Sequence, residues 1–320
     1  MIRRLFLAAL SSLPWSSAFA TDWPTKPIKI IVPFPAGGAT DLPARLVGER
    51  LGKLWQQPVI IENRPGAGGS LAAAEVARST ADGYTLLFPS GSVMTVNQFV
   101  YSKLPYDPEK DFTPITIVVS GPSVLVVPEA SPFTSIDALI AGVRKSPGKL
   151  TFGHAGIGSQ SHMANEYFLQ QAKLEALGVP YKGDPPAIVD MVGGHLDFAI
   201  MSLGASLSVI KSGKLRALGV TSKDAISQLP GVPPIASVLP NFDNSGWFGL
   251  VAPANMPPDV ARKIAQDVHT VLEDPELHAR FETLGFRVVA NSPQAMSEAM
   301  VAERKRWGKL VKDRGIGQLQ

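Results

Sequence analysis

A predicted strand, a glycine-rich loop and an amphipathic helix follow one another over residues 28–54, and this order narrows the folds open to the chain. Residues 28–32 form an apolar run typical of a buried strand, and residues 41–54 place leucines on one side of a helix. A helix that starts at a glycine turn presents unpaired backbone N–H groups at the positive end of its dipole, where an anion binds. The loop therefore supplies the first candidate ligand contacts, which are Phe34, Pro35, Ala36, Gly37, Gly38, Ala39, Thr40 and Asp41.

Strand-like and helix-like runs alternate along the rest of the chain. Predicted strands lie at residues 59–62, 84–88, 115–119, 124–127, 150–152, 179–181, 198–200, 215–220 and 286–289, and late helices begin at Pro257, Pro275 and Ser292. This alternation predicts an α/β fold with largely parallel sheets. In such sheets, ligands bind beyond the carboxyl ends of the strands, where loops lead into helices.

A second loop of small residues, at residues 153–162, follows a predicted strand and opens another helix. It adds Gly156, Ile157, Gly158 and Ser159 as candidate ligand contacts. A single glycine-rich loop is weak evidence for a binding site, because glycine also serves tight turns. Two well-separated helix starts of this kind indicate a cleft between two lobes.

Three serines become candidates because each follows a predicted strand. Ser90 and Ser92 come after the strand at 84–88, and Ser202 comes after the strand at 198–200. Each is open to a second interpretation as an ordinary turn serine, since turns favour serine. Asp41 is likewise interpreted first as a helix cap, and Phe34 first as a core side chain.

The first 20 residues carry the pattern of a secretory signal peptide. Arg3 and Arg4 precede a short apolar stretch, and Ala18 and Ala20 are the small residues expected before a cleavage site. The apolar stretch is interrupted too early to span a bilayer. We therefore expect export to the periplasm, cleavage near Ala20 and a mature chain that is not embedded in the membrane.

Charge and cysteine content exclude several functions. The 320-residue chain has a net charge of +3, and two of its positive charges belong to Arg3 and Arg4, so a nucleic-acid partner is not expected. The chain contains no cysteine, which removes disulfides, thiol nucleophiles and thiolate metal sites. We expect neither a cofactor nor a metal ion.

Eight short segments lie in order along the mature chain: WPTKPI (23–28), PFPAGGATD (33–41), ENRPGAGG (62–69), ADGYTLL (81–87), KLPYDP (103–108), VPYKG (179–183), GGHLD (193–197) and GKLRAL (213–218). Together they resemble the Bug-type extracytoplasmic solute receptors of tripartite tricarboxylate transporters. The resemblance implies a type II periplasmic binding fold, with two α/β lobes joined by a two-crossing hinge around a ligand cleft. Lobe 1 would comprise residues 21–121 and 246–320, and lobe 2 would comprise residues 122–245.

The same resemblance implies a function. A monomeric receptor would capture a small organic acid or an amino-acid-like ligand by lobe closure and deliver it to integral membrane transporter subunits. The loops at residues 35–41 and 156–161 would hold ligand carboxylates through backbone amides and ordered water. No covalent step is implied.

The second lobe departs from the family pattern at three positions. Ile157 and Gln160 stand where asparagine and serine are usual, and Asp184 stands where a small or neutral residue commonly follows the Tyr-Lys-Gly motif. Asp184 has two interpretations. It is either a helix N-cap or a cleft residue that pairs with an ammonium or amide group of the ligand.

Two other functions are weighed against the transport receptor. A ligand-sensing receptor for a membrane signalling protein would use the same closure, so the sequence does not separate it from transport. A secreted hydrolase is less well supported, because the P-loop, G-x-S-x-G and H-E-x-x-H signatures are all missing. The sequence therefore favours a receptor that is not an enzyme.

Overall fold

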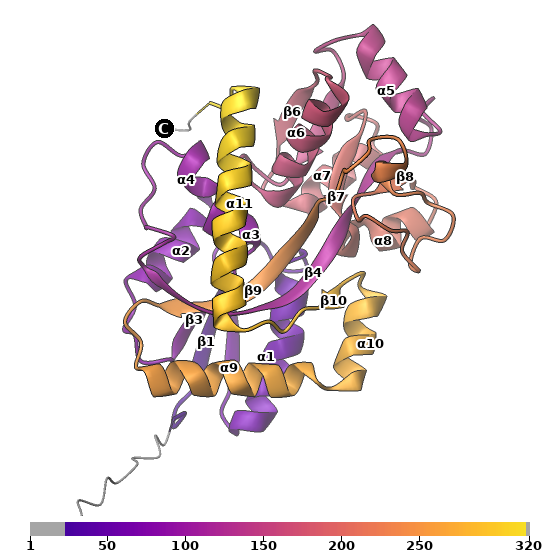
Figure 1. Cartoon of the computed structure of the whole chain (residues 1–320). Coiled ribbons are helices and arrows are strands. Elements are labelled where there is room, and N and C mark those ends of the chain that lie inside the picture. The colour runs from indigo at the N-terminus through magenta and orange to yellow at the C-terminus, as the bar shows by residue number, and fades with distance from the viewer. Residues whose placement is uncertain (1–22, 318–320) are drawn as a thin grey trace, which may run out of the picture.

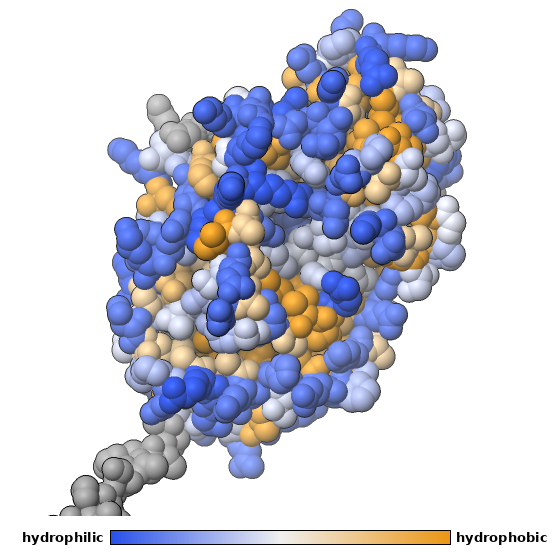
Figure 2. Space-filling model, viewed as in Figure 1, coloured by the Kyte–Doolittle hydropathy of each residue, from blue (hydrophilic) through white to orange (hydrophobic). Residues whose placement is uncertain are grey.

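The computed structural model of the chain describes residues 23–317 and has two α/β lobes, which lie one above the other in Figure 1. The predicted signal peptide at residues 1–20 lies outside the described residues. Within residues 23–317, none of the helices combines the length and the apolar character that crossing a bilayer requires. In the same view, Figure 2 shows hydrophilic side chains over most of the surface, with smaller apolar areas on both lobes.

The first lobe, the lower one in Figure 1, is built on a sheet with the strand order β10-β4-β9-β3-β1-β2. Its strands are β1 (Ile28–Val32), β2 (Val59–Asn63), β3 (Thr85–Leu87), β4 (Phe112–Pro128), β9 (Ser245–Pro253) and β10 (Arg287–Val288). Strand β1 is buried at four of its five positions, which explains its nearly continuous apolar sequence. It pairs in parallel with both β2 and β3.

Helices cover both faces of this sheet because neighbouring residues of β1 point to opposite sides. Ile30 packs in one core cluster with side chains of α1 (Asp41–Trp55) and α9 (Pro258–Leu272). Ile31 packs in another cluster with side chains of α2 (Ser70–Ala77) and α11 (Pro293–Arg314). The lobe is completed by the short helices α3 (Gly91–Thr95) and α4 (Asn97–Val100) and by α10 (Pro275–Thr283).

The second lobe repeats this layered arrangement around the far half of β4. That half pairs antiparallel with β7 (Ala199–Ser202) and β8 (Leu215–Val220), while β5 (Thr151–His154) pairs in parallel with β6 (Leu177–Pro180). The covering helices are α5 (Ile136–Lys145), α6 (Gln160–Ala172), α7 (Asp184–Val192) and α8 (Leu203–Lys211). Side chains of α5 and α6 pack in one core cluster with Leu125, and those of α7 and α8 pack in another with Val124.

Strands β4 and β9 connect the two lobes as one antiparallel pair. Their register runs without a break through Ser120 opposite Trp247, Gly121 opposite Gly246, and Pro122 opposite Ser245. The sequence prediction of two separate strands at 115–119 and 124–127 was therefore wrong. The Gly-Pro dipeptide resembles a turn, but here it lies inside a 17-residue strand.

The prediction of largely parallel sheets was also wrong. All the pairings of β4 are antiparallel, and only β1 with β2, β1 with β3, and β5 with β6 are parallel pairs among the named strands of the described chain. Strand β9 was not among the predicted strands, and only the boundary between the lobes was expected near its start. The α/β class itself is confirmed.

Helix α11 runs beside both lobes (Figure 1) and contacts them through apolar and polar side chains. Its C-terminal half joins a cluster in which Trp307 and Leu310 pack with Val96 and Met163 of the two lobes. The Arg314 guanidinium donates to Glu166 on α6, with Nε and Oε2 2.8 Å apart. These contacts hold the lobes together on the side of the molecule where α11 lies.

Candidate functional site

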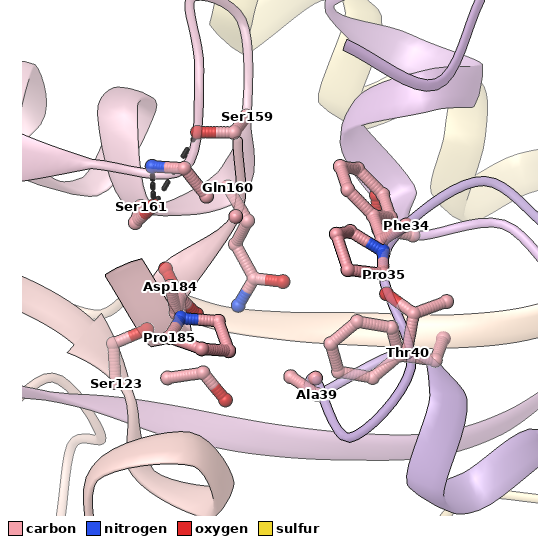
Figure 3. Close-up of a pocket in the computed structure, with 16 residues that line it drawn as sticks. Phe34, Pro35, Ala39, Thr40, Ser123, Ser159, Gln160, Ser161, Asp184 and Pro185 are labelled. Atoms are coloured by element: carbon pink, nitrogen blue, oxygen red, sulfur yellow. Dashed lines mark hydrogen bonds between the residues drawn. The ribbon is translucent and has the colours of Figure 1, made fainter. Parts of the chain in front are cut away.

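A cavity lies between the two lobes, where strands end and helices begin (Figure 3). Its empty volume, including the part open to solvent, is about 490 Å³. In Figure 3 the wall with Phe34, Pro35, Ala39 and Thr40 faces the wall with Asp184 and its neighbours. The lining residues are Phe34, Pro35, Gly38, Ala39, Thr40, Ser90, Ser123, Ala155, Ser159, Gln160, Ser161, Gly183, Asp184, Pro185, Ser202 and Phe248.

The loop before α1 is held in shape by the buried carboxylate of Asp41. One oxygen, Oδ2, accepts hydrogen bonds from the Gly37 backbone N–H at 2.9 Å and from Arg45 Nε at 2.8 Å. The other oxygen accepts from Asn63 Nδ2 at 2.8 Å. Burial acts to raise the pKa of Asp41, but the hydrogen bonds outweigh it and hold the pKa below its ordinary value. Asp41 stabilises the loop from behind and does not line the cavity.

This loop leaves two backbone donors without a partner beside the cavity. The Asp41 N–H closes a turn on the Gly38 carbonyl, with N and O 3.1 Å apart, and α1 begins there. Among the hydrogen bonds of residues 23–317, none uses the backbone N–H of Ala39 or Thr40, and both residues line the cavity. Unpaired N–H groups at the start of a 15-residue helix form an anion site.

The loop before α6 presents a second set of donors. The Ser159 hydroxyl caps the helix by accepting the His162 N–H at 3.2 Å, and His162 Nδ1 accepts the Gly158 N–H at 3.1 Å. Within the described chain, no hydrogen bond uses the N–H of Gln160 or Ser161, the first two residues of α6. Helices α7 and α8 also begin at residues beside the cavity. The N-termini of α1, α6, α7 and α8 therefore meet around one space, and the short helix α3 also begins there, after Ser90.

Two buried histidines support the second loop. The rings of His154 and His162 lie tilted against each other with centroids 4.3 Å apart. Burial lowers the pKa of His154 to about 4, and burial together with the neighbouring His154 lowers the pKa of His162 to about 3. Both rings are therefore neutral at physiological pH, and neither lines the cavity.

Asp184 is not a helix N-cap, because Gly183 occupies that position and Asp184 is the first residue of α7. Its carboxylate takes hydrogen bonds from the Ser161 side chain and the Ser202 backbone. Oδ1 is buried, and within residues 23–317 it has no hydrogen-bond partner. Burial raises the pKa of Asp184 to about 6, against the lowering effect of those hydrogen bonds.

The structure brings nine of the sixteen predicted ligand contacts to this cavity. They are Phe34, Pro35, Gly38, Ala39, Thr40, Ser90, Ser159, Asp184 and Ser202. The other seven lie behind it or elsewhere. Ser92 lines a second cavity and bonds to the Ser90 hydroxyl at 2.9 Å, and Ile157 packs against the apolar cluster beside α11. Ala36, Gly37, Asp41, Gly156 and Gly158 shape the two loops without lining the cavity.

Several lining residues escaped the sequence prediction. Ser123 and Phe248 lie on β4 and β9, which reach the cavity only because these strands cross between the lobes. Gln160 and Ser161 belong to the loop at residues 156–161 where the family resemblance implied carboxylate binding, but they were not among the individually named contacts. A signal for them was available, because the first two residues after an N-cap always carry free N–H groups.

The Gln160 side chain separates the cavity from its neighbour. It lines both spaces, the second of which has an empty volume of about 290 Å³ and is bordered by Trp247 and Glu303. Its amide lies over Gly246, where an added Cβ would be 1.5 Å from Nε2. Burial raises the pKa of Glu303, which accepts a hydrogen bond from Thr95 Oγ1 at 3.1 Å.

Two α/β lobes around a cavity ringed by helix N-termini define a two-lobed solute-binding protein. A family model described as "Tripartite tricarboxylate transporter family receptor" (TctC) matches residues 43–316. The chain belongs to this family of extracytoplasmic solute-binding receptors. The resemblance to Bug-type receptors and the type II periplasmic binding fold are both confirmed.

Individual relatives agree with this assignment. Protein BugT of Bordetella pertussis is 35% identical over 298 residues, which cover 92% of this chain and 91% of BugT. The structure of the R. palustris protein Rpa4515 with adipate is 34% identical, with a TM-score of 0.90, over 93% of this chain and all of that one. MatC from Rhodopseudomonas palustris with bound malate is 30% identical, with a TM-score of 0.85, over 90% of this chain and all of that one.

Proposed function

We propose that this receptor captures a small carboxylate-bearing solute in the cavity and delivers it to the integral membrane subunits of a tripartite tricarboxylate-type transporter. The supporting observation is the pair of helix starts that face each other across the cavity. Unpaired N–H groups of Ala39 and Thr40 lie on one wall, and those of Gln160 and Ser161 lie on the other. Related receptors bind adipate and malate, and both of these ligands are dicarboxylates.

Binding would couple to closure of the lobes. We infer lobe 1 at residues 21–121 and 246–320 and lobe 2 at residues 122–245, since β4 and β9 pass between the two cores near both limits. A carboxylate that contacts donors on both walls binds the closed form better than the open form, and this difference shifts the population towards closure. The receptor would work outside the cytoplasm, in the periplasm, after removal of the N-terminal signal.

The chemistry of the lining supports binding without reaction. Asp184 is the one ionisable side chain among the lining residues of the described chain, and neither a histidine nor a lysine lines the cavity beside a serine. A serine nucleophile needs an adjacent base that is oriented by a third group, and among the lining residues of the described chain no histidine or second ionisable side chain accompanies Ser161 and Asp184. We therefore infer that the cavity holds its solute and does not transform it.

A ligand screen combined with one backbone substitution tests this function. Adipate, malate and the common amino acids are each compared with their carboxamides by thermal shift and titration calorimetry. Ala39 occupies the first central position of the Gly38–Asp41 turn, where proline is favoured, so Ala39→Pro removes the N–H and retains the turn. We expect about a 10- to 100-fold loss of affinity for the best acid, the effect of one hydrogen bond to a charged group.

Ala39→Gly is the matched control, because it keeps the N–H and should bind nearly as wild type does. Equal binding of acids and carboxamides would contradict the proposal, as would an Ala39→Pro variant of unchanged affinity. Release of a chemically altered product would show that the chain is an enzyme.

A further inference from the structure

The cavity contains a negative charge without a positive partner. Asp184 is the one charged side chain among the lining residues, and no lysine, arginine or histidine of the described chain lines the cavity. Arg45, the basic residue that bonds to the α1 loop, donates to Asp41 and Asn63. A receptor for a simple dicarboxylate has no need of a carboxylate in its binding cavity, because like charges repel.

The hydrogen bonds around Asp184 use only part of its capacity. The Ser161 Oγ accepts the Ala155 N–H at 2.9 Å and lies 3.3 Å from the Ser159 Oγ, so its hydroxyl is shared between Ser159 and the neighbouring Asp184 carboxylate. The Ser202 backbone supplies a second hydrogen bond. Oδ1 remains buried and unpartnered among the residues that the structure describes. A buried carboxylate oxygen without a donor is costly, so a donor from the solute would stabilise the complex.

Figure 3 places Asp184 on the wall opposite Ala39 and Thr40, with open space between them. One wall therefore offers donors for an anion, and the other offers an acceptor for a cation. We propose that the solute is a zwitterion, whose carboxylate binds at the start of α1 and whose protonated amine donates to Oδ1 of Asp184. This proposal rests on the proposed function and names the class of solute within it.

The position of Asp184 at the start of α7 supports its charged form. A helix N-terminus stabilises a carboxylate in its first turn. With a pKa of about 6, Asp184 is mostly ionised at pH 7.5. An ammonium group is then the solute group that satisfies both its charge and its free oxygen.

Matched solute pairs test the proposal at pH 7.5 by titration calorimetry. Each pair differs only by the amine: L-glutamate with glutarate, L-aspartate with succinate, 4-aminobutyrate with butyrate, and L-norleucine with hexanoate. We expect the tightest ligand to carry the amine and to bind at least tenfold more tightly than its partner without it. Asp184→Asn should reduce that preference to less than threefold. Asp224→Asn, which removes one charge from an exposed position, is the matched control and should retain the preference.

The outcomes separate this proposal from the function on which it rests. If wild-type receptor binds glutarate, succinate or hexanoate as tightly as the amino counterpart, the zwitterion proposal is wrong while the carboxylate receptor stands. An Asp184→Asn variant that keeps the full preference would also overturn it. Absence of binding by every acid in both screens would contradict the proposed function and this inference together. The wild-type comparison decides the question even if the Asp184 variant fails to fold.

Discussion

At the scale of residues, two aspartates, one behind the α1 loop and one on the opposite wall of the cavity, show how local donors set the charge of a buried carboxylate. Asp41 has three donors, one of them the guanidinium of Arg45, and its pKa is lowered. Asp184 has hydrogen bonds but no cationic partner, and its pKa is raised to about 6. The first carboxylate stabilises a loop, and the second is available to a ligand.

The raised pKa of Asp184 gives a testable dependence of stability on pH. Between its ordinary value near 4 and about 6, the folded state holds the proton that the unfolded state has lost. Stability of the unliganded receptor therefore falls as pH rises through this window. Asp184→Asn lacks this effect, so above pH 6 it should be more stable than wild type by up to about 3 kcal/mol.

Urea unfolding at pH 4, 5, 6 and 8 measures this difference. The two histidines with lowered pKa values weaken both proteins alike at acidic pH, so the difference between variants isolates Asp184. The free energies of unfolding of wild type and Asp184→Asn should become equal near pH 4. A constant difference across the series would show that Asp184 does not titrate in this range.

At the residue scale, the sequence is most informative where a single loop decides the local geometry. The free N–H groups of Ala39 and Thr40 follow from a helix that starts at a glycine turn, and Ser159 caps its helix as serine commonly does. Ser92 and Ile157 do not line the cavity, for a different reason. Each stands two positions from a lining residue, but its side chain lies in another cavity or an apolar cluster. That direction depends on packing between distant segments.

At the scale of elements, the helix starts were more predictable than the sheet. Ser135 and Ser292 accept the N–H groups of Ala138 and Ala295 at 3.1 Å, so local chemistry sets the starts of α5 and α11. The course of β4 depends instead on its partner β9, which lies more than 100 residues away in the sequence. A Gly-Pro dipeptide that would end an isolated strand is tolerated because β9 carries Gly246 opposite Gly121.

The contact between β9 and α6 supports a second mutational prediction. In Gly246→Ala, the new methyl group would overlap the Gln160 amide, which must then move from its place between the two cavities. Because the far end of a flexible side chain gives way, we expect a stability loss of about 1 kcal/mol or less. Solute affinity should fall severalfold, since the displaced amide enters the binding space.

The double variant Gly246→Ala/Gln160→Ala should recover most of the affinity, because the colliding group is gone. Isothermal titration with the best acid measures this recovery. Gly52→Ala is the control, since a Cβ on that α1 glycine meets its neighbours at 3.4 Å or more. Strictly additive losses in the double variant would refute a collision between the two side chains.

At the scale of the whole molecule, α11 controls how readily the lobes separate. Arg314 donates to Glu166 Oε2 and also to the Leu174 carbonyl, with Nη1 and O 3.3 Å apart. Both partners belong to the second lobe, whereas the start of α11 packs on the first lobe. The pair is only partly exposed, so it should contribute more than a surface ion pair, which is worth about 0–1 kcal/mol.

Arg314→Ala should therefore favour the open form and weaken solute binding by about 3- to 10-fold, because less receptor is competent to bind. Small-angle X-ray scattering of the unliganded variant should show a larger radius of gyration that returns to the wild-type value with saturating solute. Lys312→Ala, at an exposed position of the same helix, should change neither quantity. Identical scattering of wild type and Arg314→Ala would show that α11 does not hold the lobes together.

The paired strands that join the lobes also determine the mechanical character of their movement. Because β4 and β9 remain hydrogen-bonded to each other on both sides of Gly121 and Gly246, neither strand can swing alone. When the lobes separate, both strands must twist and bend together. This deformation costs energy, so it opposes a large angle between the lobes. The paired strands therefore resist a large opening angle and favour return to the closed arrangement. We expect solute release to need only a modest separation of the lobes.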